Sequence, residues 1–192
     1  MEIFATSDLH LFHRNIIKYC NRPFASVEEM NEAIIRNWNA VVPEDGRVYV
    51  LGDFMLVRDY REKVQQLHSV VSRLNGEKIL VMGNHDYYDN QDYLDAGFSY
   101  VYDGFIGAYE HNVYFIMSHY QMTTWEDSHR GSMHLFGHEH WRQQHEPKHS
   151  IFEEMHWSER KFNVCMDANG FKPVNLKSII SILNRRPTNF QP

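Results

Sequence analysis

The sequence predicts an α/β fold that opens with alternating strands and helices and continues into a β-rich second half. In the first half, short apolar runs alternate with longer segments whose apolar residues recur at helical spacing. In the second half, short apolar or alternating segments are separated by turn residues. The alternation of strand and helix indicates a parallel sheet, in which ligands bind beyond the carboxyl ends of the strands.

Three apolar runs of the first half are expected to form buried strands, at Glu2 to Ser7, Val48 to Leu51 and Ile79 to Met82. Polar side chains follow each run closely. Asp8, Asp53 and Asn84 are therefore expected to converge at one edge of the sheet, although they lie far apart in the sequence.

Two helices are expected between these strands. Ser26-Val-Glu-Glu29 is a capping-box pattern, and it predicts a helix that begins there and extends to about Val42. The second helix is expected over Arg61 to Asn75, where the apolar residues fall on one face and Gly76 follows as a stop signal.

The second half is expected to begin with a hairpin, in which Tyr100 to Tyr109 and Val113 to Met117 flank a turn at 110–112. Two more strands are predicted at Met133 to Phe136 and Phe162 to Met166, and a closing helix at Leu176 to Leu183. The histidine-rich, polar stretch at 141–160 is expected to be a long loop.

Length and composition limit the classes of protein that fit. The 192 residues suffice for one domain with a full core, expected at 1–184, followed by a tail at 185–192. A net charge of −6 argues against broad phosphate-led nucleic-acid binding as the main function. No apolar run reaches the length of a membrane span, and no signal peptide is recognised. The two cysteines, Cys20 and Cys165, form no disulfide framework, so a cytoplasmic location is expected.

Five polar clusters each follow an apolar strand. They are Asp8-Leu9-His10, Gly52-Asp53, Gly83-Asn84-His85-Asp86, Ser118-His119 and Gly137-His138-Glu139-His140. Together they supply carboxylates, imidazoles and one amide but no thiolate, which suits divalent cations such as manganese, iron, zinc or nickel. The donors suffice for two ions that share a bridging carboxylate.

The motifs DxH, GD, GNHD, a histidine after a strand, and GHxH, in that order, resemble those of the calcineurin-like metallophosphoesterase superfamily. The resemblance spans Asp8 to His140 and therefore covers most of the chain. It implies a four-layer α/β/β/α sandwich with a two-metal site at the carboxyl edge of the strands. It also implies two divalent metal ions per chain, with Mn²⁺ expected first and iron, zinc, nickel or Mg²⁺ as alternatives.

The resemblance implies a metal ligand at each of seven positions. One metal would be held by Asp8, His10 and His140, the other by Asn84, His119 and His138, and Asp53 would bridge the two. A hydroxide that bridges both ions would then attack phosphorus in line, with the ions neutralising charge on the phosphoryl oxygens.

The remaining candidates would act on the substrate. In the family, the histidine that corresponds to His85 protonates the leaving oxygen or stabilises its charge, which suits an imidazole. Asp86 has two equally weighted roles, as a partner that orients His85 or as a helix N-cap. Arg14 and His13 are expected at the pocket wall, where they would bind substrate phosphate, with a solvated loop as the alternative. Arg22 is a weaker candidate for the same contact.

The resemblance therefore predicts a metal-dependent phosphoesterase, a hydrolase that preferably cleaves phosphodiesters of nucleotide type or other small diesters. A phosphomonoesterase and a nuclease on short nucleic acids are the alternatives. A non-catalytic scaffold is disfavoured because all seven ligands and His85 are present. A mononuclear metalloenzyme such as an amidohydrolase is a further rival. The expected partner is a phosphate-ester substrate; no membrane or obligatory protein partner is inferred, and the oligomeric state stays open.

Overall fold

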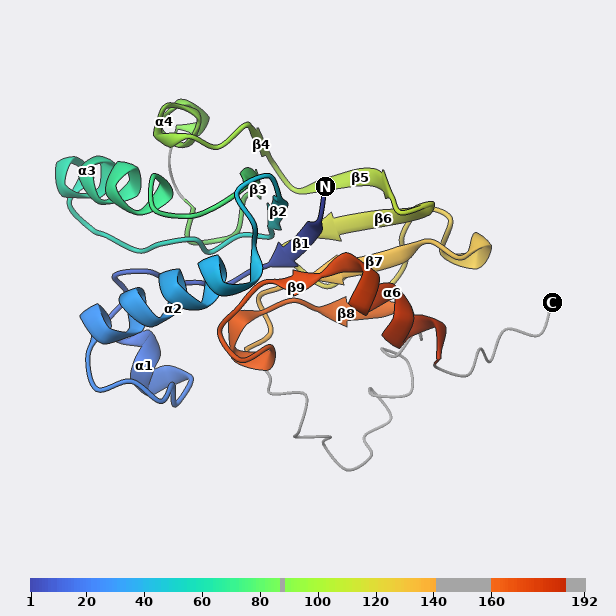
Figure 1. Cartoon of the computed structure of the whole chain (residues 1–192), viewed down its shortest axis with the longest axis horizontal. Coiled ribbons are helices and arrows are strands. Elements are labelled where there is room, and N and C mark those ends of the chain that lie inside the picture. Colours follow the sequence, from blue (N-terminus) through green and yellow to red (C-terminus); the bar gives the residue numbers. More distant parts are fainter. Residues whose placement is uncertain (87–88, 141–159, 186–192) are drawn as a thin grey trace.

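The structure is a computed structural model that describes residues 1–86, 89–140 and 160–185 (Figure 1). The histidine-rich loop expected at 141–160 lies outside these ranges except for residue 160. The tail expected at 185–192 lies outside them except for residue 185. In the described ranges, no helix is both long and apolar enough to cross a membrane.

A five-stranded mixed sheet forms the first half of the fold, in the order β4-β3-β2-β1-β9. Its strands are β1 (Ile3–Thr6), β2 (Arg47–Val50), β3 (Glu77–Val81), β4 (Tyr100–Tyr102) and β9 (Val174–Asn175). The first four run parallel, and β9 pairs antiparallel with β1. The carboxyl ends of the four parallel strands therefore lie at the same edge of the sheet.

Four helices belong to this half: α1 (Ile16–Tyr19), α2 (Val27–Val41), α3 (Tyr60–Val71) and α4 (Asn90–Ala96). The hydroxyl of Ser26 accepts a hydrogen bond from the Glu29 amide, which confirms the predicted cap of α2. Asp59 caps α3 in the same way.

A second mixed sheet, in the order β5-β6-β7-β8, packs against the first. Its strands are β5 (Phe105–Glu110), β6 (Val113–Ser118), β7 (Met133–Phe136) and β8 (Lys161–Asn163). The pair β5–β6 is antiparallel, whereas β6–β7 and β7–β8 are parallel. The closing helix α6 (Leu176–Asn184) follows β9 and contacts β1 and β8. Two mixed sheets with their helices confirm the predicted α/β fold.

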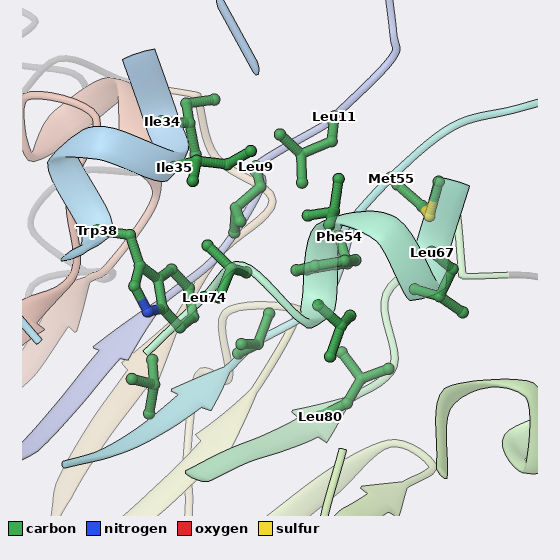
Figure 2. Packing of buried hydrophobic residues seen from close by; sticks show 14 of the residues in the cluster. Leu9, Leu11, Ile34, Ile35, Trp38, Phe54, Met55, Leu67, Leu74 and Leu80 are labelled. Carbon is green, nitrogen blue, oxygen red and sulfur yellow. The ribbon is translucent and has the colours of Figure 1, made fainter. Parts of the chain in front are cut away.

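Two apolar clusters hold the layers together. Alternate residues of the parallel strands face opposite ways, so Phe4 and Val48 join the helix-side cluster while Ala5 and Tyr49 join the cluster between the sheets. Figure 2 shows the helix-side cluster, in which Trp38 of α2 is fully buried. The inter-sheet cluster also takes in the apolar face of α6.

The loops after β1 and β2 are anchored in the helix-side cluster. Leu9 and Leu11 from the first loop, and Phe54 and Met55 from the second, are fully buried there (Figure 2). A bridge pairs Leu11 with Met55 and ties the two loops to each other. The apolar residues thereby fix the loops that carry the polar residues of the site.

Three expected boundaries were wrong. The segment 100–109 is not one strand, because the turn at Asp103 and Gly104, with Gly104 at φ +78°, divides it between the two sheets. The strand predicted at Phe162 to Met166 ends at Asn163, and Met166 begins a short 3₁₀ helix. The helix predicted to Asn75 ends at Val71. It is followed by tighter turns, in which backbone hydrogen bonds join residues three positions apart.

Candidate active site

The candidate site residues lie in the segments that follow β1, β2, β3, β6 and β7. Four of them have left-handed backbones: Asp8 (φ 56°), His10 (φ 50°), Asp53 (φ 54°) and His138 (φ 65°). Such conformations cost of order 1–3 kcal/mol each and persist where neighbouring structure determines them. Here backbone bonds join the loops, from Asp8 N to Gly52 O and from His10 N to Asp53 O, each at 2.9 Å.

The glycines of the GD and GNHD motifs allow these loops to approach each other. A Cβ on Gly83 would lie 2.6 Å from the Asp53 carboxylate and 2.9 Å from the His119 ring. A Cβ on Gly52, which has φ +84°, would lie 2.6 Å from the Gly83 amide nitrogen. Both positions therefore require glycine if the polar side chains are to converge.

The first donor group consists of Asp8, His10 and His140. The Nε2 atoms of His10 and His140 lie 3.2 Å apart, and His140 Nε2 is 3.6 Å from Asp8 Oδ1. Asp8 and His10 are buried, and the Asp8 carboxylate also accepts the backbone amide of His138. The first motif of the series, at Asp8 to His10, therefore contacts the last motif, at Gly137 to His140, directly.

The second donor group consists of Asn84, His119 and His138. His119 Nε2 lies 2.9 Å from Asn84 Oδ1 and 3.2 Å from His138 Nδ1. The opposite ring nitrogen of His119, Nδ1, donates to the Leu51 carbonyl at 2.8 Å, since a carbonyl only accepts. This bond leaves the lone pair of Nε2 directed at its two neighbours.

Asp53 lies between the two groups. Its Oδ2 is 3.4 Å from His10 Nε2 and 3.6 Å from His119 Nε2, and its Oδ1 accepts the backbone amide of His85 at 2.8 Å. One carboxylate oxygen therefore faces a nitrogen donor from each group.

The electrostatics of this cluster fit bound divalent cations. Burial raises the pKa of Asp53 to about 6, against the opposing effect of His119. Burial, together with the nearby His140 and Arg22, lowers the pKa of His10 well below its usual value. Imidazoles with close nitrogen–nitrogen approaches and a buried carboxylate between them form a donor set that cations would complete.

The histidines expected to meet the substrate border the first donor group. The ring of His85 lies 5.4 Å from that of His10 and 6.1 Å from that of His13. His13 is half-buried, and its Nδ1 lies 3.4 Å from His10 Nδ1. Arg14 is exposed. The structure thus brings His13 next to the cluster.

Asp86 is buried beneath the site and accepts four hydrogen bonds. Its Oδ2 accepts the amides of Asp53 and Gly83, and its Oδ1 accepts the Phe54 amide and the Tyr93 hydroxyl. The following helix, α4, has Asp89 as its N-cap, so the N-cap role considered for Asp86 was wrong.

Sequence reasoning missed Asp167 and the role of Arg22, two residues beside the first donor group. Asp167 accepts the Nδ1–H of His140 at 2.8 Å, and Arg22 pairs with Asp167. Asp167 directly follows the predicted strand Phe162 to Met166, so the rule that found the other clusters would have found it. Arg22, expected only as a weak phosphate contact, is 3% exposed and turned into the protein.

Tyr120 is exposed beside the second donor group. Its ring lies 5.0 Å from that of His119 and 4.7 Å from that of His138. Trp125 is buried against His134 and donates to Ser132.

Comparison with known proteins places this arrangement in context. Residues 1–118 match the family model described as calcineurin-like phosphoesterase. The uncharacterized protein MJ1445 of Methanocaldococcus jannaschii is 32% identical over 185 residues, which cover 96% of this chain and 92% of that protein. The gene 66 protein of Mycobacterium phage L5 is 34% identical over 83 residues, 42% of this chain and 38% of that protein.

A solved structure has the same fold along almost the whole chain. The crystal structure of AQ665 from Aquifex aeolicus, a protein of unknown function, matches with a TM-score of 0.68 at 22% identity. The match covers 94% of this chain and 98% of that chain. The described architecture is therefore a known fold.

Proposed function

The chain belongs to the calcineurin-like phosphoesterase family, whose members are hydrolases of phosphate esters, and we propose that it is a two-metal phosphodiesterase acting on nucleotide-type or other small diesters. Under this proposal the two donor groups each hold one divalent cation, and Asp53 bridges them. Mn²⁺ is the expected metal, with iron, zinc, nickel or Mg²⁺ as alternatives, because imidazoles, carboxylates and one amide oxygen suit divalent ions of this kind.

The observation that carries the proposal is the position of Asp53. A single carboxylate oxygen lies 3.4 Å and 3.6 Å from one imidazole nitrogen of each group. A bridging carboxylate is the ligand that offsets repulsion between two cations. When bound, the cations lower the pKa of a water molecule and neutralise charge on the phosphoryl oxygens.

The chain's own residues then have distinct tasks. His85, at the border of the first group, is placed to give a proton to the leaving oxygen, and its backbone amide holds the Asp53 carboxylate. Asp86 positions rather than reacts, because its carboxylate is engaged by the backbone of the loops that carry Asp53 and Asn84. His13 flanks His85 and narrows the approach of the substrate.

The charge of the site supports a diester in preference to a monoester. The guanidinium of Arg22, which lies beside the first group, is already bound to Asp167 and to two carbonyls. A diester carries one negative charge per phosphate, so it needs less compensation beyond the two cations than the dianion of a monoester.

The test is hydrolysis of bis-p-nitrophenyl phosphate compared with p-nitrophenyl phosphate, with Mn²⁺ added and a chelator control. A chelator-sensitive preference for the diester supports the proposal, and cyclic nucleotides and short oligonucleotides would then separate small substrates from nucleic acid. A preference for the monoester would replace the proposed activity with a phosphatase activity. Fewer than two metal ions per chain would contradict the two-metal site.

A further inference from the structure

A buried ion pair lies directly behind the first donor group. The Arg22 guanidinium contacts Asp167 with two parallel hydrogen bonds, Nε to Oδ1 at 3.0 Å and Nη2 to Oδ2 at 2.7 Å. Both side chains are almost completely buried, with 0% and 3% of their surfaces exposed. A bidentate pair with this burial has a fixed orientation.

The same guanidinium also binds the loop that carries Asp8 and His10. Its Nη2 donates to the Asp8 carbonyl at 2.7 Å, and its Nη1 donates to the Leu9 carbonyl at 2.9 Å. This loop has left-handed residues at Asp8 and His10, and such a conformation needs support from its surroundings. The two hydrogen bonds from Arg22 supply that support to the loop.

Asp167 in turn fixes the position of His140, the last ligand candidate in the sequence. Its Oδ2 accepts the Nδ1–H of His140 at 2.8 Å, so the other ring nitrogen, Nε2, is the one that faces His10 and Asp8. A carboxylate that fixes the tautomer and orientation of a histidine in this way makes it a better metal ligand. One guanidinium therefore joins the first and last members of the donor group.

We propose that Arg22 and Asp167 are positioning residues that preorganise the Asp8, His10 and His140 group as one unit and so set the affinity of that site for its metal ion. The inference rests on the proposed two-metal function. It assigns the pair to one of the two sites, because the partners of His119 and Asn84 lie in other loops. Loss of the pair should thus weaken one ion and spare the other.

A third metal ion is the rival explanation of this cluster, because Cys20, His140 and Asp167 also present ligand atoms within 4.8 Å of one another. The contacts favour the positioning role. Both oxygens of Asp167 are already bound by a guanidinium, whose positive charge opposes a nearby cation. His140 Nδ1 carries the proton that it donates to Asp167.

The experiment counts and ranks the bound Mn²⁺ ions in the purified full chain, by competition with a chelating dye. Wild type is compared with Asp167→Asn, which keeps an acceptor for His140, and Asp167→Ala, which removes it. We expect Asp167→Ala to weaken one ion by about 10- to 100-fold and leave the other unchanged, with Asp167→Asn between. Arg22→Lys, which keeps the charge but not the three-way contact, should weaken the same ion.

Double variants identify the ion that is lost. Asp167→Ala should add little to His10→Ala, because both act on one site, whereas with His119→Ala it should leave no tightly bound ion. The matched control is Glu32→Gln, which disrupts a bidentate Arg73–Glu32 pair on the surface and should change neither ion. Circular dichroism checks that each variant is folded.

Three results would overturn the inference. Wild-type affinity for both ions in a folded Asp167→Ala would leave the pair only a structural role. Equal weakening of both ions would remove its assignment to one site. Three ions in wild type, with the third lost in Asp167→Ala, would show a separate metal site instead. Fewer than two ions in wild type would contradict the proposed function, and that failure is visible without any variant.

Discussion

At the amino ends of the parallel strands, Arg47 begins β2 and Glu77 begins β3, and the guanidinium donates to Glu77 at 2.7 Å and to Glu110 of β5 at 3.3 Å. Glu110 also accepts the Tyr49 hydroxyl at 2.6 Å. At the carboxyl ends, Asp53 instead lies among imidazole nitrogens. One end pairs opposite charges within the protein, and the other brings together donors for cations.

This difference indicates which end of the strands is suited to bind cations. The cluster around Arg47 contains its own positive charge, and it links the two sheets through β5. In the cluster around Asp53, burial raises the pKa of the carboxyl to about 6, so the protein alone does not fully stabilise its charged form. An ionic cluster whose charges are balanced by the protein's own residues stabilises the fold. A cluster whose charges need added cations is suited to bind those cations and to take part in a reaction.

The largest effect is expected from Asp53→Asn, which removes the charge that faces both donor groups. We expect kcat/KM to fall by at least about 100-fold, beyond the range typical of residues that only orient a ligand. Bound Mn²⁺ should fall below two per chain, as measured by elemental analysis, while circular dichroism stays unchanged. Two tightly bound ions and full turnover in this variant would show that the site needs no carboxylate at position 53 to bridge the two ions.

The next effect is expected from His85→Ala, which should lower kcat by about 10²- to 10⁴-fold while both ions stay bound. The loss should be smallest for p-nitrophenyl esters, whose leaving group needs little protonation, and larger for alkyl diesters. Kinetics on a series of leaving groups measures this. A loss of the same size on every ester would exclude His85 as the proton donor.

The part of the fold that could be predicted is the part with local signals. The apolar runs located β1, β2 and β3 within one or two residues, and Ser26 marked the start of α2. By contrast, β9 has only two residues, and its pairing with β1 determines it rather than any pattern of its own. The division of 100–109 depends on which sheet each part meets, which alternation alone does not encode.

The candidate site shows the same limit. The motif series predicted which side chains converge, because strand ends of parallel sheets meet at one edge. Asp167 also follows the strand predicted at Phe162 to Met166, so the same argument would have reached it, but no motif drew attention to it. The position of Arg22 had no local signal, since its partners Asp8 and Asp167 are 14 and 145 positions away. A buried cation that binds distant carbonyls is visible only in three dimensions.

At the amino end, Glu110→Ala should change stability and leave activity unchanged. The variant leaves the buried Tyr49 hydroxyl without its acceptor, a loss worth about 1–3 kcal/mol of unfolding free energy. Urea unfolding measures it, with kcat/KM and bound Mn²⁺ as wild type. Glu126→Ala is the matched control, because it removes the same kind of bond from the hydroxyl of Tyr114, where the bond is exposed to solvent, and should cost less. A change in metal binding would contradict the division between the two ends.

The smallest effect at neutral pH concerns His134, a buried histidine away from both ends. Its Nδ1 donates to Ile116 O and its Nε2 accepts the Met122 amide, so the folded protein holds the neutral ring. Burial, with the charge of Lys161, lowers its pKa to about 4 from 6.5, against the opposing bond to Ile116. Unfolding therefore takes up a proton as pH falls below 6.5.

This histidine should leave stability unaffected above about pH 7 and reduce it progressively between pH 6.5 and 4. At pH 5 its share of the loss is about 2 kcal/mol. His134→Gln, which can make the same two hydrogen bonds, should flatten the difference in unfolding free energy between pH 7.5 and pH 5 by that amount in urea titrations. An unchanged slope would mean that the ring is protonated in the folded state. Because His134 satisfies both nitrogens within the protein, this measurement separates a structural histidine from the histidines around Asp53.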